Sequence, residues 1–218
     1  MRRFVLVVAV GLVFCAQGVF AAPPEGEGWE LSKQGEGIDV YTRPVEGLDA
    51  KEFMAIGEVD APLRVIMQVV RDIPSYPQWY GFCRDIRQLE EYNESHRLVY
   101  FVLATLWPTK DRDMVIEAVD VTDYEKGISK VTTRALKEEI VPLDKRYVRM
   151  THMIGNITFT EKDGKTHVVY TCQSDPAGKV PVSLSNMIAI NQPYDSIVGL
   201  RKMVQKDEYW QKAGLTRQ

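Results

Sequence analysis

The sequence has few of the residues that metal centres and covalent catalysis require. Its 218 residues include only three cysteines and three histidines, and no C-x-x-C pair or other zinc-ligand spacing is present. It also lacks a G-x-S-x-G elbow, a glycine-rich phosphate loop and an H-E-x-x-H sequence. We therefore expect a protein without metal, cofactor or catalytic residues, which is not an enzyme.

The sequence has no excess of positive charge. It carries 27 Lys and Arg against 30 Asp and Glu, a formal net charge of −3. Proteins that bind nucleic acids, or that adhere to anionic membranes by bulk charge, need clustered basic residues. We expect no nucleic-acid partner. A chain of this length is sufficient for one large domain with a core and an internal cavity.

The cysteines give little evidence of cross-linking. Cys15 lies in the N-terminal leader, so Cys83 and Cys172 are the two that remain in a mature chain. Export would permit a disulfide between them, but a bridge also needs a close approach of the two backbones. We favour two buried free thiols over a bridge.

The N-terminus has the layout of a secretory signal. Two arginines precede an apolar run at residues 4–14, and Ala21 stands where a signal peptidase cleaves. An uncleaved membrane anchor is the alternative, although the run is short for a span and is interrupted at residues 17–18. We expect residues 1–21 to be a signal peptide and residues 22–218 to form one exported domain, periplasmic or secreted.

The first part of the mature chain mixes helical and extended patterns. Trp29–Gln34 is interpreted as a short helix, and strands are predicted at Ile38–Val45 and Phe53–Val59. Asp60 is the expected N-cap of the next helix, in which apolar residues recur at helical spacing. A second short helix is predicted at Ser75–Tyr80. Two strands followed by two helices therefore precede the rest of the chain.

From residue 83 to residue 175 the apolar period changes to two, which predicts an antiparallel meander. The predicted strands are Ile86–Tyr92, Arg97–Leu106, Met114–Val121, Ser129–Ala135, Val148–Thr160 and Thr166–Ser174. A long helix follows at Pro181–Glu208, and Pro193 inside it predicts a kink or break near Asn191. This order favours an α+β fold in which a curved antiparallel sheet wraps around a long C-terminal helix and encloses a pocket.

Three segments resemble landmarks of one known family. Trp107–Asp113, with the sequence W-P-T-K-D-R-D, resembles the W-P-x-x-D-R-D turn of START domains, the lipid-transfer modules related to the steroidogenic acute regulatory protein. Asp175–Pro181 is similar to the start of that family's C-terminal helix, and Ile73–Trp79 is similar to the helix before its central strands. Their order and spacing extend the resemblance over about residues 30–205.

The resemblance implies a helix-grip fold with a hydrophobic tunnel for one lipid, often a sterol or a phospholipid. It also implies a lid made of the C-terminal helix and the loop Leu136–Tyr147, which is otherwise an ordinary solvated loop. Some sterol-transfer members carry a buried acid–arginine pair where this sequence has Val99 and Ala118. That difference puts recognition of a sterol hydroxyl at these positions in doubt.

The resemblance also orients the strands around the tunnel. Glu117 is expected to face outward, because a buried carboxylate would need a partner to offset its desolvation. In the helix, we expect the half before Pro193 to face the ligand and the half after Tyr194 to be anchored in the core. Ordinary core packing is the alternative for every one of these side chains. The predicted cavity residues are Trp79, Val99, Phe101, Leu103, Ile116, Ala118, Met187, Ile190, Asn191, Tyr194 and Val198.

Two classes of function follow from this interpretation. The first is a monomeric carrier that binds a lipid or sterol-like hydrophobic ligand and contacts membranes transiently. The second is an enzyme of the same superfamily, such as a polyketide cyclase or aromatase, for which the inward polar candidates are His152, Tyr170 and Asn191. An accessory protein that binds another exported protein is a third option. We favour the carrier.

Overall fold

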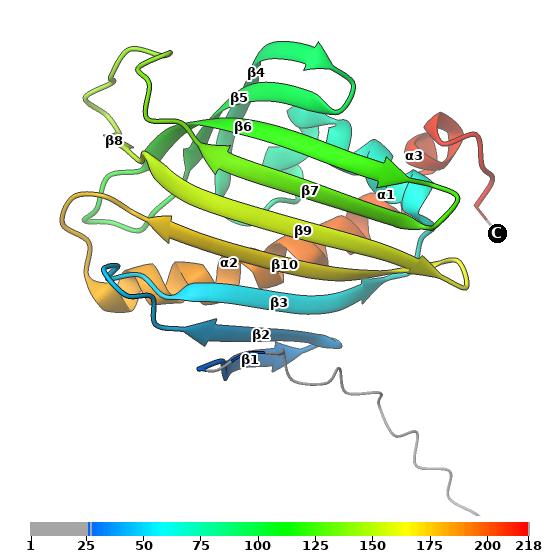
Figure 1. Ribbon diagram of the computed structural model, residues 1–218, viewed down its shortest axis with the longest axis horizontal. Coiled ribbons are helices and arrows are strands. Elements are labelled where there is room, and N and C mark those ends of the chain that lie inside the picture. Colours follow the sequence, from blue (N-terminus) through cyan, green and yellow to red (C-terminus); the bar gives the residue numbers. More distant parts are fainter. Residues whose placement is uncertain (1–25, 27, 218) are drawn as a thin grey trace, which may run out of the picture.

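The computed structural model describes residue 26 and residues 28–217. The predicted signal peptide, residues 1–21, lies outside the described residues. Nine strands form one sheet in the order β1-β2-β3-β10-β9-β7-β6-β5-β4, every neighbouring pair antiparallel, and the short β8 pairs in parallel with β6 (Figure 1). The strands are β1 Glu30–Gly35, β2 Ile38–Arg43, β3 Glu52–Val59, β4 Cys83–Asn93, β5 His96–Leu103, β6 Arg112–Asp123, β7 Ile128–Ala135, β8 Val148–Arg149, β9 His152–Lys162 and β10 Lys165–Asp175.

The sheet curves around one long helix, α2 (Val182–Met203), which runs along its inner face (Figure 1). Within the described residues there are three shorter helices: α1 (Leu63–Arg71), the 3₁₀ helix η1 (Ile73–Gln78) and α3 (Asp207–Lys212). The α+β helix-grip fold expected from the sequence is therefore confirmed. Among the described residues, no helix combines the length and the apolar character needed to cross a membrane.

Alternation along β5 explains why the sheet has two different apolar faces. Val99 and Phe101 point to the inner face, whereas Leu98, Tyr100 and Val102 are buried on the outer face. Successive side chains of a strand point to opposite sides, so a strand that is apolar at every position must be covered on both. The inner face meets α2 and the outer face is covered by a loop described below.

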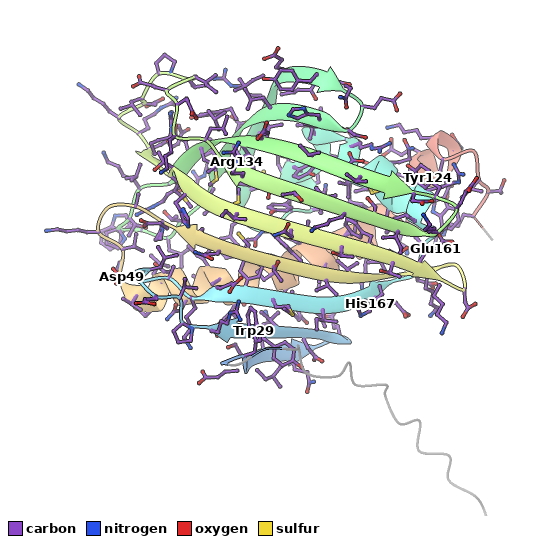
Figure 2. All side chains as sticks on the ribbon, in the orientation of Figure 1. Trp29, Asp49, Tyr124, Arg134, Glu161 and His167 are labelled. Carbon is purple, nitrogen blue, oxygen red and sulfur yellow. The ribbon has the colours of Figure 1, made fainter. Side chains whose placement is uncertain are left out.

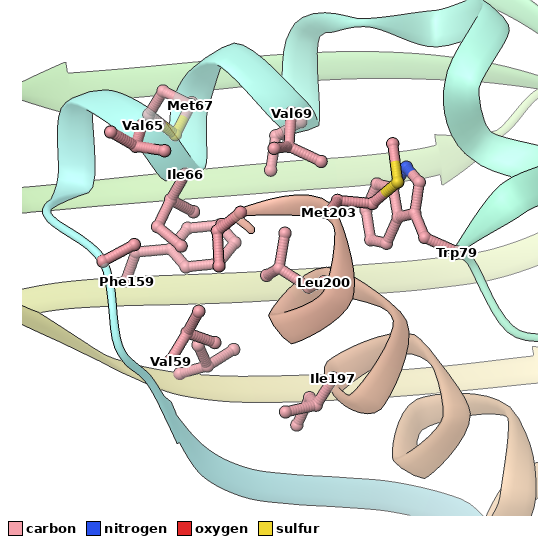
Figure 3. Close-up of a cluster of buried hydrophobic side chains, with 14 of the residues drawn as sticks. Val59, Val65, Ile66, Met67, Val69, Trp79, Phe159, Ile197, Leu200 and Met203 are labelled. Carbon is pink, nitrogen blue, oxygen red and sulfur yellow. The ribbon is translucent and has the colours of Figure 1, made fainter. Parts of the chain in front are cut away.

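The second half of α2 is packed into the main hydrophobic core. Ile197, Leu200 and Val204 are each at most 3% exposed and pack with α1 and with Phe159 of β9 (Figure 3). The expected anchoring of this half is thus confirmed. A hydrogen bond fixes the start of α1: the Leu63 amide donates to the carboxylate of Glu161, 2.8 Å away. The expected cap by Asp60 was wrong: the residue before the helix is Pro62, and the capping carboxylate comes from the β9–β10 hairpin.

Two further expectations about helices need correction. Trp29–Gln34 is not a helix, because its backbone pairs with β2 as strand β1, and a hairpin supplies partners that so short a helix would lack. The C-terminal helix does not break near Asn191. It continues through Pro193 and ends at Met203, and α3 begins only at Asp207. The interruption falls where the indole nitrogen of Trp210 donates to the carbonyl of Val204 at 2.7 Å.

Candidate ligand cavity

A cavity of about 150 Å³ lies between the first half of α2 and the inner face of the sheet. Its walls come from β3, from the segment after α1, from the central strands and from α2. Apolar and aromatic side chains dominate this lining. They include Phe53, Ile73, Tyr76, Tyr80, Ile86, Met114, Met150, Met153, Ile157, Tyr170, Cys172, Ile188 and Ala189.

The predicted cavity residues outside α2 do line it. These are Trp79, Val99, Phe101, Leu103, Ile116 and Ala118. Glu117, between the last two, is not part of the lining. Its carboxylate accepts a hydrogen bond from Arg134 of β7 at 2.8 Å and lies 3.0 Å from the His96 ring nitrogen. Figure 2 labels Arg134 on the sheet. The two-residue period therefore gave the correct facing for β5 and β6. Contact of these residues with a ligand stays a prediction.

The helix residues predicted for the cavity do not line it. Asn191 accepts a hydrogen bond from the amino group of Lys33 at 2.8 Å, and that amino group also lies 3.7 Å above the Tyr194 ring, so this side of α2 faces β1. Ser185, Ile188, Ala189 and Gln192 line the cavity instead. With about 100° of rotation per residue, the predicted and the observed sets lie on nearly opposite sides of the helix. The predicted helix residues that lie outside the cavity lining are Met187, Ile190, Asn191, Tyr194 and Val198.

A small polar cluster interrupts the apolar lining. The hydroxyls of Tyr80 and Tyr170 are hydrogen-bonded to each other, and the Gln192 amide donates to the Tyr170 hydroxyl at 3.4 Å. Ser196 accepts from the backbone amide of Gly81 at 2.9 Å, which fixes the helix against the segment that carries Tyr80. Burial raises the pKa of both tyrosines well above the ordinary value, so both are neutral hydrogen-bonding groups at physiological pH.

Sequence reasoning did not select Tyr80 or Gln192, and it considered Tyr170 only for an enzyme. Tyr170 lies on the same face of β10 as the buried residues Val168 and Cys172. The two-residue period of this strand could therefore have placed it inward. Tyr80 lies between η1 and β4, in a segment without helix or strand periodicity from which a facing could be predicted. Gln192 required the rotation of α2 to be known.

Arg112 closes one end of the cavity. It is 2% exposed, and its guanidinium donates to the carbonyls of Lys110, Pro176 (3.0 Å) and Ala177 (3.2 Å). These bonds join the β5–β6 turn, residues 104–111, to the β10–α2 connector, residues 176–181; we call the two segments the rim. Burial lowers the pKa of Arg112. Arg112 therefore ties the turn to the connector, and its side chain also lines the cavity.

The neighbouring Asp113 joins the turn to the outer face of the sheet. Its carboxylate is 1% exposed, accepts two hydrogen bonds from Arg149 at 3.1 and 2.8 Å, and accepts one from the Tyr100 hydroxyl at 2.9 Å. Burial and this carboxylate raise the pKa of Tyr100 to about 12. The hydrogen bond to Asp113 raises the pKa of Arg149.

The loop Leu136–Tyr147 does not cover the cavity. Leu136, Val141 and Tyr147 pack on the outer apolar patch of Leu98, Tyr100, Val102 and Val115, and Arg149 holds the Val141 carbonyl at 3.1 Å. None of the loop residues lines the cavity. The expected lid role is therefore wrong for this structure. The physical reason is the outer apolar patch, which these loop residues cover together with Leu89 of β4.

Charged and nucleophilic groups are scarce in the cavity. Among the described residues that line it there is no aspartate, glutamate or histidine, and Lys51 and Arg112 are the charged ones. Within the same part of the chain, no group of three or more His, Cys, Asp or Glu side chains is placed to hold a metal ion. Cys83 and Cys172 are free thiols, as favoured from the sequence, and burial raises the pKa of each to about 12.

Comparison with known proteins agrees with this geometry. The sequence profile of the START domain matches residues 21–208. A STAR-related lipid transfer protein from Xanthomonas axonopodis, known as a crystal structure, is 27% identical with a TM-score of 0.74, over 83% of this chain and 100% of that one. Human StAR-related lipid transfer protein 5 has the same fold at 17% identity, with a TM-score of 0.72 over 82% of this chain and 87% of that one.

A bacterial relative extends the similarity at the level of sequence. An uncharacterized protein of Pseudomonas aeruginosa is 26% identical over 183 residues, which cover 83% of this chain and 88% of the relative. The profile match spans most of the chain and coincides with the sheet, the cavity and α2. This chain belongs to the START domain family.

Proposed function

We propose that this protein is a non-enzymatic carrier that binds one lipid or similar hydrophobic molecule in the cavity under α2. The observation that supports this most directly is the lining itself, which is apolar except for a few neutral groups and the two cations at one end. Burying an apolar chain there contributes about 0.8 kcal/mol for each CH₂ group. The solved relative from Xanthomonas axonopodis is named a lipid transfer protein, which favours the same function.

The enzyme alternative requires acid and base groups that converge on a substrate. Of its three candidates, His152 and Asn191 lie outside the cavity lining, and only Tyr170 is part of it. Burial raises the pKa of Tyr170 well above its usual value, so the side chain is unsuited to proton transfer at neutral pH. A cyclase reaction therefore has little support in this cavity.

The rim has the composition of a membrane-contacting surface. Trp107, in the β5–β6 turn, is 92% exposed, and its neighbour Leu106 is more than half exposed. Val182, where α2 follows the connector, is also more than half exposed. Lys110 and Lys179 line a second hollow at the same end of the molecule. Tryptophan partitions to the interface between lipid and water, and lysines attract anionic headgroups. We infer that the rim docks transiently on membranes while lipid passes.

The cavity is small for its proposed ligand. Pockets for drug-sized molecules occupy roughly 300–1,000 Å³, more than the 150 Å³ found here. Uptake therefore requires the first half of α2 to move away from the sheet, since the second half is held in the core. A hinge near Pro193 would separate the two halves.

Export is a separate proposal. The basic and apolar leader before residue 22 has the features of a secretory signal, and it would bring the carrier to the periplasm or outside the cell. N-terminal sequencing of the protein recovered from a cell envelope fraction tests it. A chain that still begins at Met1 contradicts cleavage.

Filling the cavity is expected to abolish lipid binding. Ala189 is 9% exposed and faces Tyr170 and Cys172, so phenylalanine at this position would occupy the ligand's space. If an overpacking cost of about 1–3 kcal/mol falls on the complex, Ala189→Phe lowers the affinity for lipid by roughly 5- to 150-fold. Native mass spectrometry of the purified protein, with extraction and identification of its lipid, measures the occupancy.

The matched control introduces the same side chain on the exposed side of the same helix. Asp195→Phe, at an exposed position, is expected to leave lipid occupancy unchanged. Equal loss in both variants would show that the effect is not on the cavity. A wild-type protein that is empty on purification and takes up nothing from phospholipid vesicles would contradict the carrier itself.

Removing the exposed indole is expected to slow transfer without weakening binding. Trp107→Ala deletes the largest exposed apolar side chain of the rim, and a loss of roughly 1.5–3 kcal/mol of interfacial burial corresponds to about a tenfold or greater decrease in transfer rate between vesicles. Stopped-flow transfer of a fluorescent lipid measures the rate. Tyr92→Ala, which removes a half-exposed aromatic next to the β4–β5 turn, is the control and should transfer as the wild type does.

A further inference from the structure

The two cavity tyrosines carry more donor protons than their surroundings use. Tyr80 and Tyr170 each have one O–H group, and the hydrogen bond between them uses one of the two protons. Gln192 donates to Tyr170 and so takes up acceptor capacity rather than a proton. Among the described residues, no hydrogen bond accepts the second O–H proton. Whichever tyrosine donates to the other, one phenol donor is left for something inside the cavity.

The surroundings of this donor make it selective. The two tyrosines lie against Phe53 and Phe101 in edge-to-face contacts with ring centroids 4.9 and 5.7 Å apart, so the wall around them is apolar. A polar group left without a partner in such a place has a substantial desolvation cost. Both hydroxyls stay protonated because burial raises their pKa, so they offer a neutral donor rather than an anion.

The position of the pair along the cavity tells which part of a ligand would reach it. Tyr170 is four residues before Ser174, a lining residue close to the rim on the same strand. At about 3.3 Å per strand residue, the pair lies roughly 13 Å inside. The cationic groups Arg112 and Lys51 are at the other end, toward the rim. A charged headgroup therefore has no counter-charge at the depth of the tyrosines.

We propose that Tyr80, Tyr170 and Gln192 form a specificity subsite that accepts one uncharged oxygen of the ligand, a carbonyl, ester, ether or hydroxyl oxygen carried on an otherwise apolar body. This inference rests on the proposed carrier function and narrows its ligand class. A lipid with a neutral oxygen about 13 Å from its outer end fits the cavity, whereas a lipid inserted with a charged headgroup first does not.

The test uses two probes that differ only in the oxygen, 2-dodecanone and dodecane. In the variant Tyr80→Phe/Tyr170→Phe both O–H groups are lost, and the affinity for the ketone is expected to fall by about tenfold while that for dodecane changes by less than about twofold. Each single variant keeps one hydroxyl and is expected to retain most of the ketone affinity. Gas chromatography of the probe that remains with the protein after gel filtration gives both affinities.

The control is Tyr76→Phe. Tyr76 also lines the cavity, but its hydroxyl donates to the carbonyl of Val70 at 2.9 Å, and it has no role in the proposed subsite. Ketone and dodecane should bind this variant in the wild-type ratio. If the double variant binds the ketone as tightly as the wild type does, or loses both probes equally, the subsite is refuted.

A second measurement does not depend on the folding of any variant. The carbonyl stretch of carbonyl-¹³C-labelled 2-dodecanone bound to the wild-type protein is expected at lower wavenumber than in hexane, because a hydrogen bond weakens the C=O bond. A stretch at the hexane position would overturn the subsite even though the carrier still binds. Failure of the wild type to bind either probe or any lipid would instead count against the carrier function.

Discussion

Replacing Gly199 by alanine is expected to lower the free energy of unfolding by about 3 kcal/mol, the largest effect that a single added methyl group should have in this protein. Gly199 lies on α2 where the helix crosses the backbone of Trp79. A Cβ atom there would overlap the carbonyl oxygen of Trp79 and lie 2.8 Å from its carbonyl carbon. Alanine normally favours a helix over glycine by about 1 kcal/mol, so a large loss would be specific to this contact.

The backbone of Trp79 has little freedom to retreat from an added methyl. Its indole is 7% exposed and donates to the Ser75 hydroxyl at 3.1 Å, and the next turn is held because the amide of Gly81 donates to Ser196. Urea denaturation followed by circular dichroism measures the change. Gly47→Ala is the control, because Gly47 has a φ of 79° but nothing within 4 Å of an added Cβ, and about 1–2 kcal/mol is expected. A Gly199→Ala protein as stable as the wild type would contradict the close crossing.

Asp113→Asn is expected to lower the free energy of unfolding by about 3 kcal/mol. The substitution removes the negative charge that faces Arg149, whose side chain is only 12% exposed, while the Asp113 site itself is buried. A buried cation without its carboxylate is left uncompensated, and the hydrogen bond from Tyr100 is weakened as well. Because Arg149 also holds the Val141 carbonyl, the loop on the outer face should become more mobile.

The control for this variant is an aspartate–arginine pair within the loop Leu136–Tyr147. Asp144 and Arg146 are 2.6 Å apart, but the arginine side chain is 76% exposed. Ion pairs in contact with water contribute about 1 kcal/mol or less, so Asp144→Asn should be nearly neutral. Thermal denaturation of the two variants at one ionic strength, with hydrogen exchange of residues 136–147, distinguishes them. Similar small losses in both variants would mean that the Asp113–Arg149 pair is not shielded from water.

Strand periodicity was sufficient for half of the cavity. Along β5, Val99 and Phe101 are inward because every second residue must be, and one correct inward position determines the whole strand. Position in the strand therefore identified five lining residues, on β5 and β6, without knowledge of α2. The same reasoning placed Glu117 outside.

Helix periodicity could not predict which side of α2 faces the cavity. Both of its sides carry apolar residues, Ile188 and Ala189 toward the cavity and Ile190 and Val198 away from it, because the helix is enclosed by sheet on more than one side. An amphipathic stripe gives an orientation only when the opposite side is polar. The rotation of α2 was decided by tertiary contacts, such as the approach of Gly199 to Trp79, that a single sequence does not reveal.

The lid predicted at the loop Leu136–Tyr147 was misplaced for a related reason. Apolar residues amid charges suggest a cover for some apolar surface, and Val141 and Tyr147 do serve as one. The sequence did not say which surface. Leu98, Tyr100 and Val102 form the patch. They alternate with the inward Val99 and Phe101, so β5 is apolar on both faces and its sequence does not show which face the loop covers.

The three carbonyl bonds of Arg112 have a consequence for the kinetics of ligand exchange. Because one guanidinium holds Lys110, Pro176 and Ala177 together, the turn that bears Trp107 and the connector that leads into α2 separate only when these bonds break in concert. At roughly 1 kcal/mol net for each bond, they add about 3 kcal/mol to the barrier for release, which lengthens the residence time of a ligand in water by about a hundredfold. Anionic lipid phosphates could compete for the same guanidinium, so residence would become short only at a bilayer.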